Sequence, residues 1–172
     1  MKKFSLIFAV LFSLILSAED ANLLRNAALT AAPNRNPAQW QCVFPAGSFR
    51  IVTLDDGSKF VQFGKGLETQ QCMLIQRDLP LEAGKKYIFS CEVQSAGANS
   101  SVMIYAEWRI PQADGKFRHA SVNARPFSPT DEWQTVAFEI PARPGNSEKP
   151  YLVISVPSGK INLRNLILTE VE

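Results

Sequence analysis

The sequence has one histidine, three cysteines and almost no excess of charge, with 18 Lys and Arg residues against 16 Asp and Glu. Three cysteines and one histidine at unrelated spacings do not make a zinc-binding pattern, so no metal ligands are predicted. Balanced charge without a basic run argues against nucleic acid as a partner, because a protein that binds nucleic acid must neutralise phosphates. An ordinary globular protein remains, with 46% apolar residues.

Long apolar runs are also missing, except for one near the start. Phe4 to Leu16 is an uncharged run of 13 residues, which is too short to span a bilayer as a helix. Two lysines precede it and Ser17-Ala18 follows it, a pattern typical of a cleavable export signal. Its removal would leave a single domain, residues 19–172, with 16 basic and 16 acidic residues. We expect a signal peptide over residues 1–18, export to the periplasm or outside a bacterial cell, and no integral membrane segment.

The cysteines leave the question of a disulfide open. Cys42, Cys72 and Cys91 allow three single pairings, each with one thiol left over, and the sequence does not choose among them or exclude all three. Cys91 falls on the apolar phase of the alternating run Tyr87–Val93. A buried thiol is the simpler interpretation at that position.

Turn-forming residues punctuate the chain at short intervals, and runs with a two-residue period lie between them. The apolar members of three such runs are Val102, Ile104, Ala106 and Trp108, then Val136, Phe138 and Ile140, and finally Leu152, Ile154 and Val156. Alternation of this kind indicates strands that bury one face in a core. No segment after residue 32 has a helical period, whereas Leu23–Ala32 fits either one helical turn or an opening strand. The predicted fold class is all-β, an antiparallel β-sandwich in a single domain.

Several segments, taken in order along the chain, share the pattern of a known family. Asn22-Leu23-Leu24-Arg25-Asn26 opens it, and residues 79–90 (LPLEAGKKYIFS) form its middle. Glu132-Trp133-Gln134 with Phe138–Pro141, and then residues 161–168 (INLRNLIL), complete it. Together these segments resemble the jelly-roll carbohydrate-binding modules grouped as families four, nine, sixteen and twenty-two. The resemblance implies a galactose-binding-like jelly roll and affinity for an oligo- or polysaccharide.

In many relatives the resemblance also implies a structural calcium ion held partly by acidic residues. Where the family has Gly-Asp/Ser-Phe-Glu, this chain has Ala27-Ala28-Leu29-Thr30, and Arg164 stands where the last strand usually carries an aspartate. Calcium takes roughly six to eight oxygen ligands, and carboxylates are preferred among them. The loss of two acids and the gain of a cation weaken the case for calcium, so no cofactor is predicted.

A predicted hairpin supplies the candidate site. If Ser101–Ile110 pairs with Lys116–Phe127, the alternation that buries Trp108 also buries three residues of the second strand, namely Ala120, Val122 and Ala124. The opposite face then carries Tyr105, Glu107, Arg109, His119, Ser121, Asn123 and Arg125. This pairing brings Glu107 across from His119, close enough to interact. An aromatic ring among hydrogen-bonding side chains suits a sugar. The alternative is an ordinary solvated sheet face, and a slip of one residue would invert the assignment.

The three tryptophans receive different interpretations. Trp133 and Trp108 are predicted to lie in the core. Trp40 follows Pro37 in a stretch that fits either burial or exposure, and an exposed ring there would stack on a ligand. The predicted ligand-binding set is therefore Trp40, Tyr105, Glu107, Arg109, His119, Asn123 and Arg125.

Catalytic patterns are missing as well. The chain has no Gly-x-Ser-x-Gly elbow and no phosphate-binding glycine loop, and any triad would have to use His119. Asp55-Asp56 fits a turn and Asp131-Glu132 the start of a strand, so neither forms an evident acid/base pair for glycoside hydrolysis. We predict a non-catalytic, exported carbohydrate-binding domain. The alternative is a structural or protein-interaction jelly roll without sugar affinity, which would bind a surface or periplasmic protein.

Overall fold

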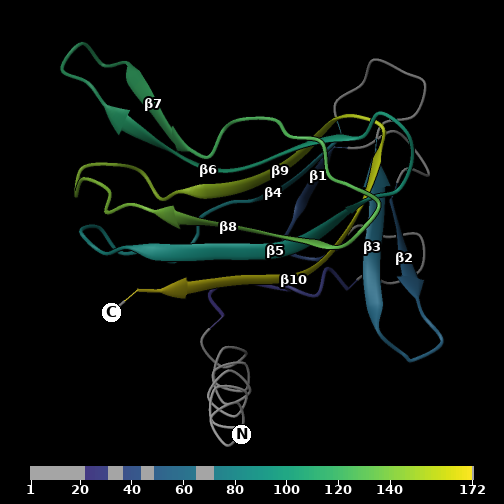
Figure 1. Ribbon diagram of the computed structural model, residues 1–172. Helices are drawn as coiled ribbons and strands as arrows, with labels where there is room; N and C mark the ends of the chain where they lie inside the picture. Colours follow the sequence, from purple (N-terminus) through teal and green to yellow (C-terminus); the bar gives the residue numbers. More distant parts are fainter. Residues whose placement is uncertain (1–21, 31–36, 44–48, 65–71, 172) are drawn as a thin grey trace, which may run out of the picture.

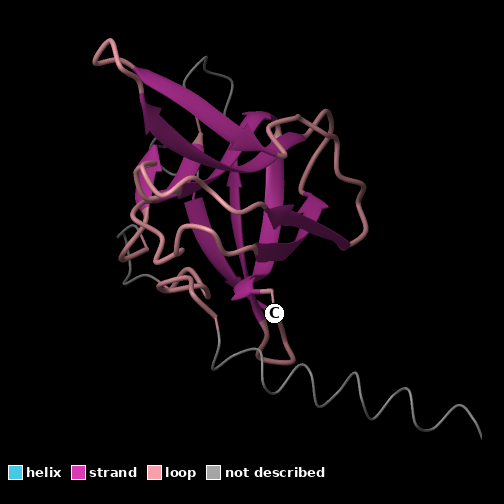
Figure 2. Ribbon diagram, turned by 90° about the vertical axis from the view of Figure 1, so that its left-hand side faces the viewer, coloured by secondary structure: helices cyan, strands magenta, loops and turns pink. Residues whose placement is uncertain are grey.

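The structure is a computed structural model that describes residues 22–30, 37–43, 49–64 and 72–171, so the predicted signal peptide lies outside the described residues. Figure 2 shows strands and loops in this part of the chain and no helix. The strands are β1 (Gln41–Val43), β2 (Phe49–Thr53), β3 (Lys59–Gly64), β4 (Met73–Gln76), β5 (Tyr87–Ser95), β6 (Ser101–Pro111), β7 (Phe117–Val122), β8 (Gln134–Ile140), β9 (Tyr151–Ser158) and β10 (Lys160–Glu170).

The strands form two five-stranded sheets, which are both antiparallel (Figure 1). Sheet A has the order β1-β4-β9-β6-β7, and sheet B has the order β2-β3-β10-β5-β8. The first half of β10 pairs with β3, and the strand pairs with β5 on both sides of a bulge between Arg164 and Ile167. The predicted antiparallel β-sandwich is confirmed.

The core lies between the two sheets and follows the predicted alternation. Ile104 on β6 and Ile154 on β9 face it from sheet A, and Phe89 on β5 and Leu163 on β10 face it from sheet B, all with 0% exposure. Moving a side chain of this size out of water stabilises the fold by about 1.5–3 kcal/mol. Trp108 also joins this cluster, as predicted.

The opening segment folds as turns rather than as a helix or a strand. Asn22 fastens it to the last strand, because its side-chain oxygen accepts the backbone N–H groups of Leu24 and Leu168, each at 3.1 Å. Its amide nitrogen donates to the carbonyl of Leu166 at 2.8 Å. A short amide side chain can satisfy three backbone groups in this way, so the first asparagine of the motif has a structural role.

The β6–β7 hairpin extends away from the rest of the sandwich (Figures 1 and 2), and residues 111–119 are all exposed. Its second strand is shorter than predicted and ends at Val122, because Asn123 adopts a φ of 60° and turns the chain. Ala124 is therefore exposed, and its predicted inward position is wrong. Beyond the turn, Phe127 forms an isolated bridge with Val102 at the other end of β6.

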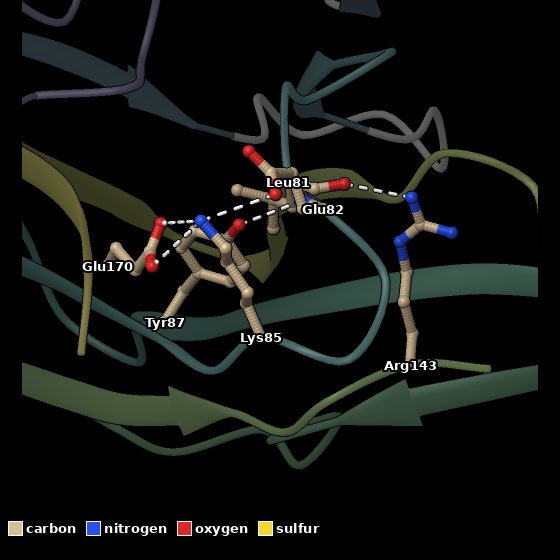
Figure 3. A network of polar contacts seen from close by, with 6 residues as sticks. All are labelled: Leu81, Glu82, Lys85, Tyr87, Arg143 and Glu170. Carbon is tan, nitrogen blue, oxygen red and sulfur yellow. Dashed lines mark hydrogen bonds and ion pairs between the residues drawn. The ribbon is translucent and has the colours of Figure 1, made fainter. Parts of the chain in front are cut away.

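Polar contacts fasten the loop that precedes β5 (Figure 3). The hydroxyl oxygen of Tyr87 accepts the backbone N–H of Glu82 at 2.8 Å, and Arg143 donates to the carbonyl of Leu81 at 2.8 Å. Lys85 lies 3.2 Å from Glu82 and 3.1 Å from Glu170 near the end of β10. These contacts join the loop to β5, to the end of β10 and to the segment that follows β8.

We expect Tyr87→Phe to lower the free energy of unfolding by about 1 kcal/mol, because the backbone N–H of Glu82 loses its acceptor while the ring stays buried. Urea unfolding followed by circular dichroism measures the change. Lys85→Met serves as the control and should leave the midpoint almost unchanged, because its ion pairs are exposed. Equal midpoints for the wild type and Tyr87→Phe would contradict the role given to this hydroxyl.

The structure forms none of the three disulfide pairings that the sequence allows. Cys42 and Cys91 are free thiols, and every pairing would need one of them. Cys91 is buried at 1% exposure, in agreement with the simpler interpretation of its position. Burial raises the pKa of Cys42 to about 11, and burial together with the neighbouring Glu92 charge raises the pKa of Cys91 to about 12.

Both raised pKa values predict slow alkylation of the native protein. At pH 8 a thiol with a pKa near 11 is almost entirely protonated, and the thiolate is the form that reacts. We expect Cys42 and Cys91 to react with iodoacetamide far more slowly in the folded protein than in 8 M urea, as measured by mass spectrometry of the labelled peptides. Equal rates in both conditions would show that these thiols are not protected as described.

Candidate functional site

The outer face of sheet A, which points away from the core, carries a buried apolar floor. Val153 on β9 pairs with Ile75 on β4 and with Tyr105 on β6, so the three side chains form a row across the sheet. Val153 is 1% exposed and Ile75 is 7% exposed, yet neither belongs to the main core cluster. Tyr151 stands two residues before Val153 on the same face. Two half-buried tyrosines therefore border a buried aliphatic residue on a face against which the described strands form no second sheet.

Glu107 is the polar centre of this face. One of its carboxylate oxygens, Oε1, accepts a hydrogen bond from the Tyr151 hydroxyl and lies 2.6 Å from Nδ1 of His119. The side chain is 18% exposed, compared with 61% for His119. Three strands, β6, β7 and β9, thus supply one hydrogen-bonded group. Two partners on one oxygen hold the carboxylate in a fixed orientation.

The tyrosines on this face stay protonated. Burial, the hydrogen bond to Glu107 and the charge of Glu107 all raise the pKa of Tyr151. The guanidinium of Arg77, 5.3 Å from the centre of the Tyr151 ring, acts in the opposite direction but is outweighed. Burial, and then the charge of Glu107, also raises the pKa of Tyr105. Both hydroxyls can therefore donate a hydrogen bond at any physiological pH.

Several polar groups on this face retain hydrogen-bonding capacity. Within the described residues, neither the Tyr105 hydroxyl nor Oε2 of Glu107 has a hydrogen-bond partner. Ser121, an exposed residue, pairs directly with Glu107 across the hairpin. A hydroxyl, a carboxylate oxygen and an aromatic ring beside a buried apolar floor can bind a polyhydroxylated ring, whose hydroxyl groups need donors and acceptors and whose C–H face needs apolar contact.

The predicted pairing of the hairpin is offset by two residues. Arg109 pairs with His119, and Glu107 pairs with Ser121, so Glu107 meets His119 on the diagonal rather than directly across. The predicted interaction nevertheless forms, because diagonal neighbours on one face remain within reach of long side chains. The two-residue offset keeps the face assignment, which a slip of one residue would have inverted.

Arg109 lies on the predicted face but contacts other parts of the protein. Its guanidinium donates to the carboxylate of Glu148, with Nε 2.7 Å from Oε2, and its carbonyl accepts the backbone N–H of that residue at 2.8 Å. The same guanidinium lies 4.9 Å from the centre of the Phe117 ring. These contacts connect the base of the projecting hairpin to the segment before β9.

Asn123 and Arg125 lie beyond the end of β7, so they are not part of the strand face on which they were predicted. The Asn123 side chain donates to the carbonyl of Ile104 at 2.8 Å, which bonds the turn to β6. Arg125 is exposed, and its backbone N–H donates to the carbonyl of Asn123. The sequence did not reveal this, because alternation continues through residue 124 and only the φ of Asn123 ends the strand.

The structure decides between the two interpretations of Trp40 and contradicts the one given for Trp133. Trp40 is 6% exposed, belongs to the core cluster and donates its indole N–H to the carbonyl of Asn26 at 3.1 Å, so the exposed alternative is wrong. Trp133 is only half-buried and is not in that cluster, so its predicted place in the core is wrong. Tyr151 was not predicted as a site residue, although its place on the polar phase of β9 was a signal for it.

The described residues do not fit a calcium site of the family type. No group of three or more His, Cys, Asp or Glu side chains lies close enough together in this part of the chain to hold a metal ion. Arg164 replaces the expected acid and is paired with Glu92, with Nε 2.6 Å from Oε2. The Asn26 side chain is occupied by hydrogen bonds to Thr30 and Ala38.

Comparison with known families decides the assignment. Residues 21–160 match the family described as a carbohydrate-binding domain. The chain belongs to this family. No curated protein matches the chain. Since the match spans most of the sequence, the predicted resemblance and the predicted glycan-binding function are confirmed at the level of the family.

Solved structures with the same fold include modules of two of the predicted groups. A protein described as "Family 16 Carbohydrate Binding Module-2" is 16% identical, with a TM-score of 0.56 over 88% of this chain and 100% of that one. The CBM22-1 xylan-binding domain of Xyn10C from Paenibacillus barcinonensis is 14% identical, with a TM-score of 0.58 over 88% of this chain and 95% of that one. These identities establish the shared fold.

A third similar structure contains a bound sugar chain. It comprises the CBM22-1 and GH10 modules of the Clostridium thermocellum xylanase 10B complexed with xylohexaose. It is 11% identical, with a TM-score of 0.58, and the match covers 89% of this chain and 29% of that one.

In the described part of the chain, no helix is long and apolar enough to cross a membrane.

Proposed function

We propose that this member of the carbohydrate-binding family is a non-catalytic module that binds a polysaccharide on the outer face of sheet A. The observation that supports the proposal is the fixed Glu107 carboxylate between the two tyrosines, beside the buried Val153. The ring of Tyr105 would stack on a sugar, and its hydroxyl, Oε2 of Glu107 and Ser121 would bond the sugar hydroxyls. His119 would act by holding Glu107, since its Nδ1 contacts the carboxylate.

Xylan is the first ligand to test, because two modules with this fold are described as xylan-binding or as complexed with xylohexaose. Many neutral β-linked chains present the same alternation of hydroxyl groups and apolar ring faces. The proposal therefore names a neutral polysaccharide as the ligand class. Several weak contacts would have to act together, because the ordering of side chains and the desolvation of polar groups offset part of the free energy that each contact contributes.

Export is the second part of the proposal. Residues 1–18 would be cleaved, and the domain, residues 19–172, would act in the periplasm or outside the cell, where polysaccharides are available. Expression of the full chain in a Gram-negative host, followed by intact-mass measurement of the periplasmic fraction, tests the processing. A product that retains residues 1–18 would contradict it.

Native affinity electrophoresis in gels that contain soluble xylan, mixed-linkage β-glucan or galactomannan tests the function, with albumin as the non-binding reference. We expect at least one of the three polysaccharides to retard the protein, and a reducing-sugar assay of the same mixtures to show no hydrolysis. Unchanged mobility of the folded protein in all three gels would favour the structural or protein-interaction alternative. Release of reducing sugar would contradict the non-catalytic assignment.

A further inference from the structure

The outer face of sheet B, on the opposite side of the sandwich from the proposed site, carries a row of polar side chains across four strands. Arg50 on β2, Gln62 on β3, Asn162 on β10 and Gln94 on β5 are successive cross-strand partners. Arg50 Nε donates to Gln62 at 2.9 Å, Gln62 donates to Asn162 at 2.9 Å, and Asn162 donates to Gln94 at 2.8 Å. This amide row ends where Gln94 donates to the carbonyl of Asp131 at 2.6 Å.

A second row runs beside the amide row and contains two aromatic rings. Trp133, which directly precedes β8, lies over this face, and the guanidinium of Arg164 on β10 is 4.1 Å from the centre of its ring. Phe60 on β3 meets Trp133 edge to face, with ring centres 5.7 Å apart. Arg164 is paired with Glu92 on β5. We call Phe60, Arg164, Glu92 and Trp133 the aromatic row.

The two rows differ from an ordinary solvated sheet face. Each amide of the amide row uses one N–H and one oxygen lone pair within the row, which leaves a second N–H and a second lone pair. The internal bonds hold these side chains in one orientation, so a ligand would not have to order them. The Arg164 and Glu92 charges cancel, and both aromatic rings are half-buried rather than part of the core. Fixed amide donors and acceptors beside aromatic rings, with one arginine at the end of the row, match the chemistry of a neutral sugar chain.

We propose that the outer face of sheet B is a second glycan-binding surface, which takes a neutral polysaccharide lying across the strands. The sugar rings rest against Trp133 and Phe60, and their hydroxyl groups bond Gln62, Gln94 and the terminal nitrogens of Arg50. Arg164 acts as a positioning residue, because it contacts the Trp133 ring and is itself held by Glu92. This surface shares no residue with the proposed site on sheet A, so an experiment can contradict either proposal without contradicting the other.

Solution NMR of the ¹⁵N-labelled protein tests the second surface, with xylohexaose and cellohexaose as probes at millimolar concentrations. The indole N–H of Trp133 reports on sheet B, whereas Trp40 and Trp108 are buried. The backbone N–H of Ser121 reports on sheet A. We expect at least one probe to shift the Trp133 signal both in the wild type and in Tyr105→Ala, whatever happens at Ser121.

Two exposed positions on sheet B give the matched variants. Arg50→Ala on the edge strand β2 should weaken the affinity measured at Trp133 by roughly tenfold, because it removes a ligand contact and the end of the amide row. Ile88→Ala, a 42% exposed position on the same face but outside both rows, should leave the affinity unchanged. A Trp133 signal that neither probe moves, or that moves only while Tyr105 is intact, would overturn the proposal. An Arg50→Ala affinity equal to that of Ile88→Ala would overturn the role of the amide row.

Discussion

Glu107→Ala is expected to weaken polysaccharide binding by roughly tenfold to a hundredfold, because it removes the charged acceptor at the centre of the sheet A face. The Tyr151 hydroxyl and His119 lose their shared partner at the same time. Both side chains then become free to rotate, so the ligand must order them again on binding. Isothermal titration calorimetry with the polysaccharide that gives the largest retardation in the gels measures the loss.

Glu148→Ala is the matched control for this prediction. Glu148 is also a carboxylate, but it accepts a hydrogen bond from Arg109 of β6 at the base of the hairpin and does not contact the tyrosines. We expect its affinity to stay within about twofold of the wild type, in line with the small effect of an exposed ion pair. Equal losses in both variants would mean that total charge, and not the position of Glu107, governs binding.

Phe89→Ala is expected to lower the free energy of unfolding by about 3–5 kcal/mol, because it opens a cavity in the centre of the core. Phe89 has 0% exposure on β5, and its ring centre lies 5.4 Å from that of Phe138 on β8. Domains of this size are stabilised by only about 5–15 kcal/mol in total, so this one change removes a large share. Urea unfolding monitored by tryptophan fluorescence measures the difference.

The neighbouring residue on the same strand provides the control. Ile88 is 42% exposed on the outer face of sheet B, so Ile88→Ala should change the free energy of unfolding by less than about 0.5 kcal/mol. The pair tests the strand assignment itself, because adjacent residues of a strand point to opposite faces. Similar losses for the two variants would contradict the alternation described for β5.

The alternating runs predicted the fold well because one buried face leaves a two-residue period in the sequence. Ile104, Ile154 and Phe138 each marked a strand in this way. The order of strands in the sheets could not be predicted, because β6 lies between β7 and β9, and its pairing with β9 joins segments about 50 residues apart. A sequence period records which face of a strand is buried but not which strand lies beside it.

The candidate site was predicted in part. Tyr105, Glu107 and His119 lie together because the hairpin loop sets the register locally. Asn123 and Arg125 were misplaced because the left-handed conformation at Asn123 ends the strand without interrupting the apolar alternation. Tyr151 was missed because its contact with Glu107 spans 44 residues of sequence. The rows on sheet B need four strands from distant parts of the chain, so only the folded structure reveals them.

The most direct test of the central claim is the affinity of Tyr105→Ala for the polysaccharide that most retards the wild type in the gels, measured by isothermal titration calorimetry beside the wild type. Tyr105 pairs with Val153 across β6 and β9, and its hydroxyl has no hydrogen-bond partner in the described part of the chain. Its removal therefore takes away ligand contacts rather than internal hydrogen bonds. We predict that the wild type binds, and that the variant folds with an unchanged circular dichroism spectrum but loses the binding heat of the sheet A face. Full binding heat in a folded Tyr105→Ala protein would contradict the assignment of the site to this face.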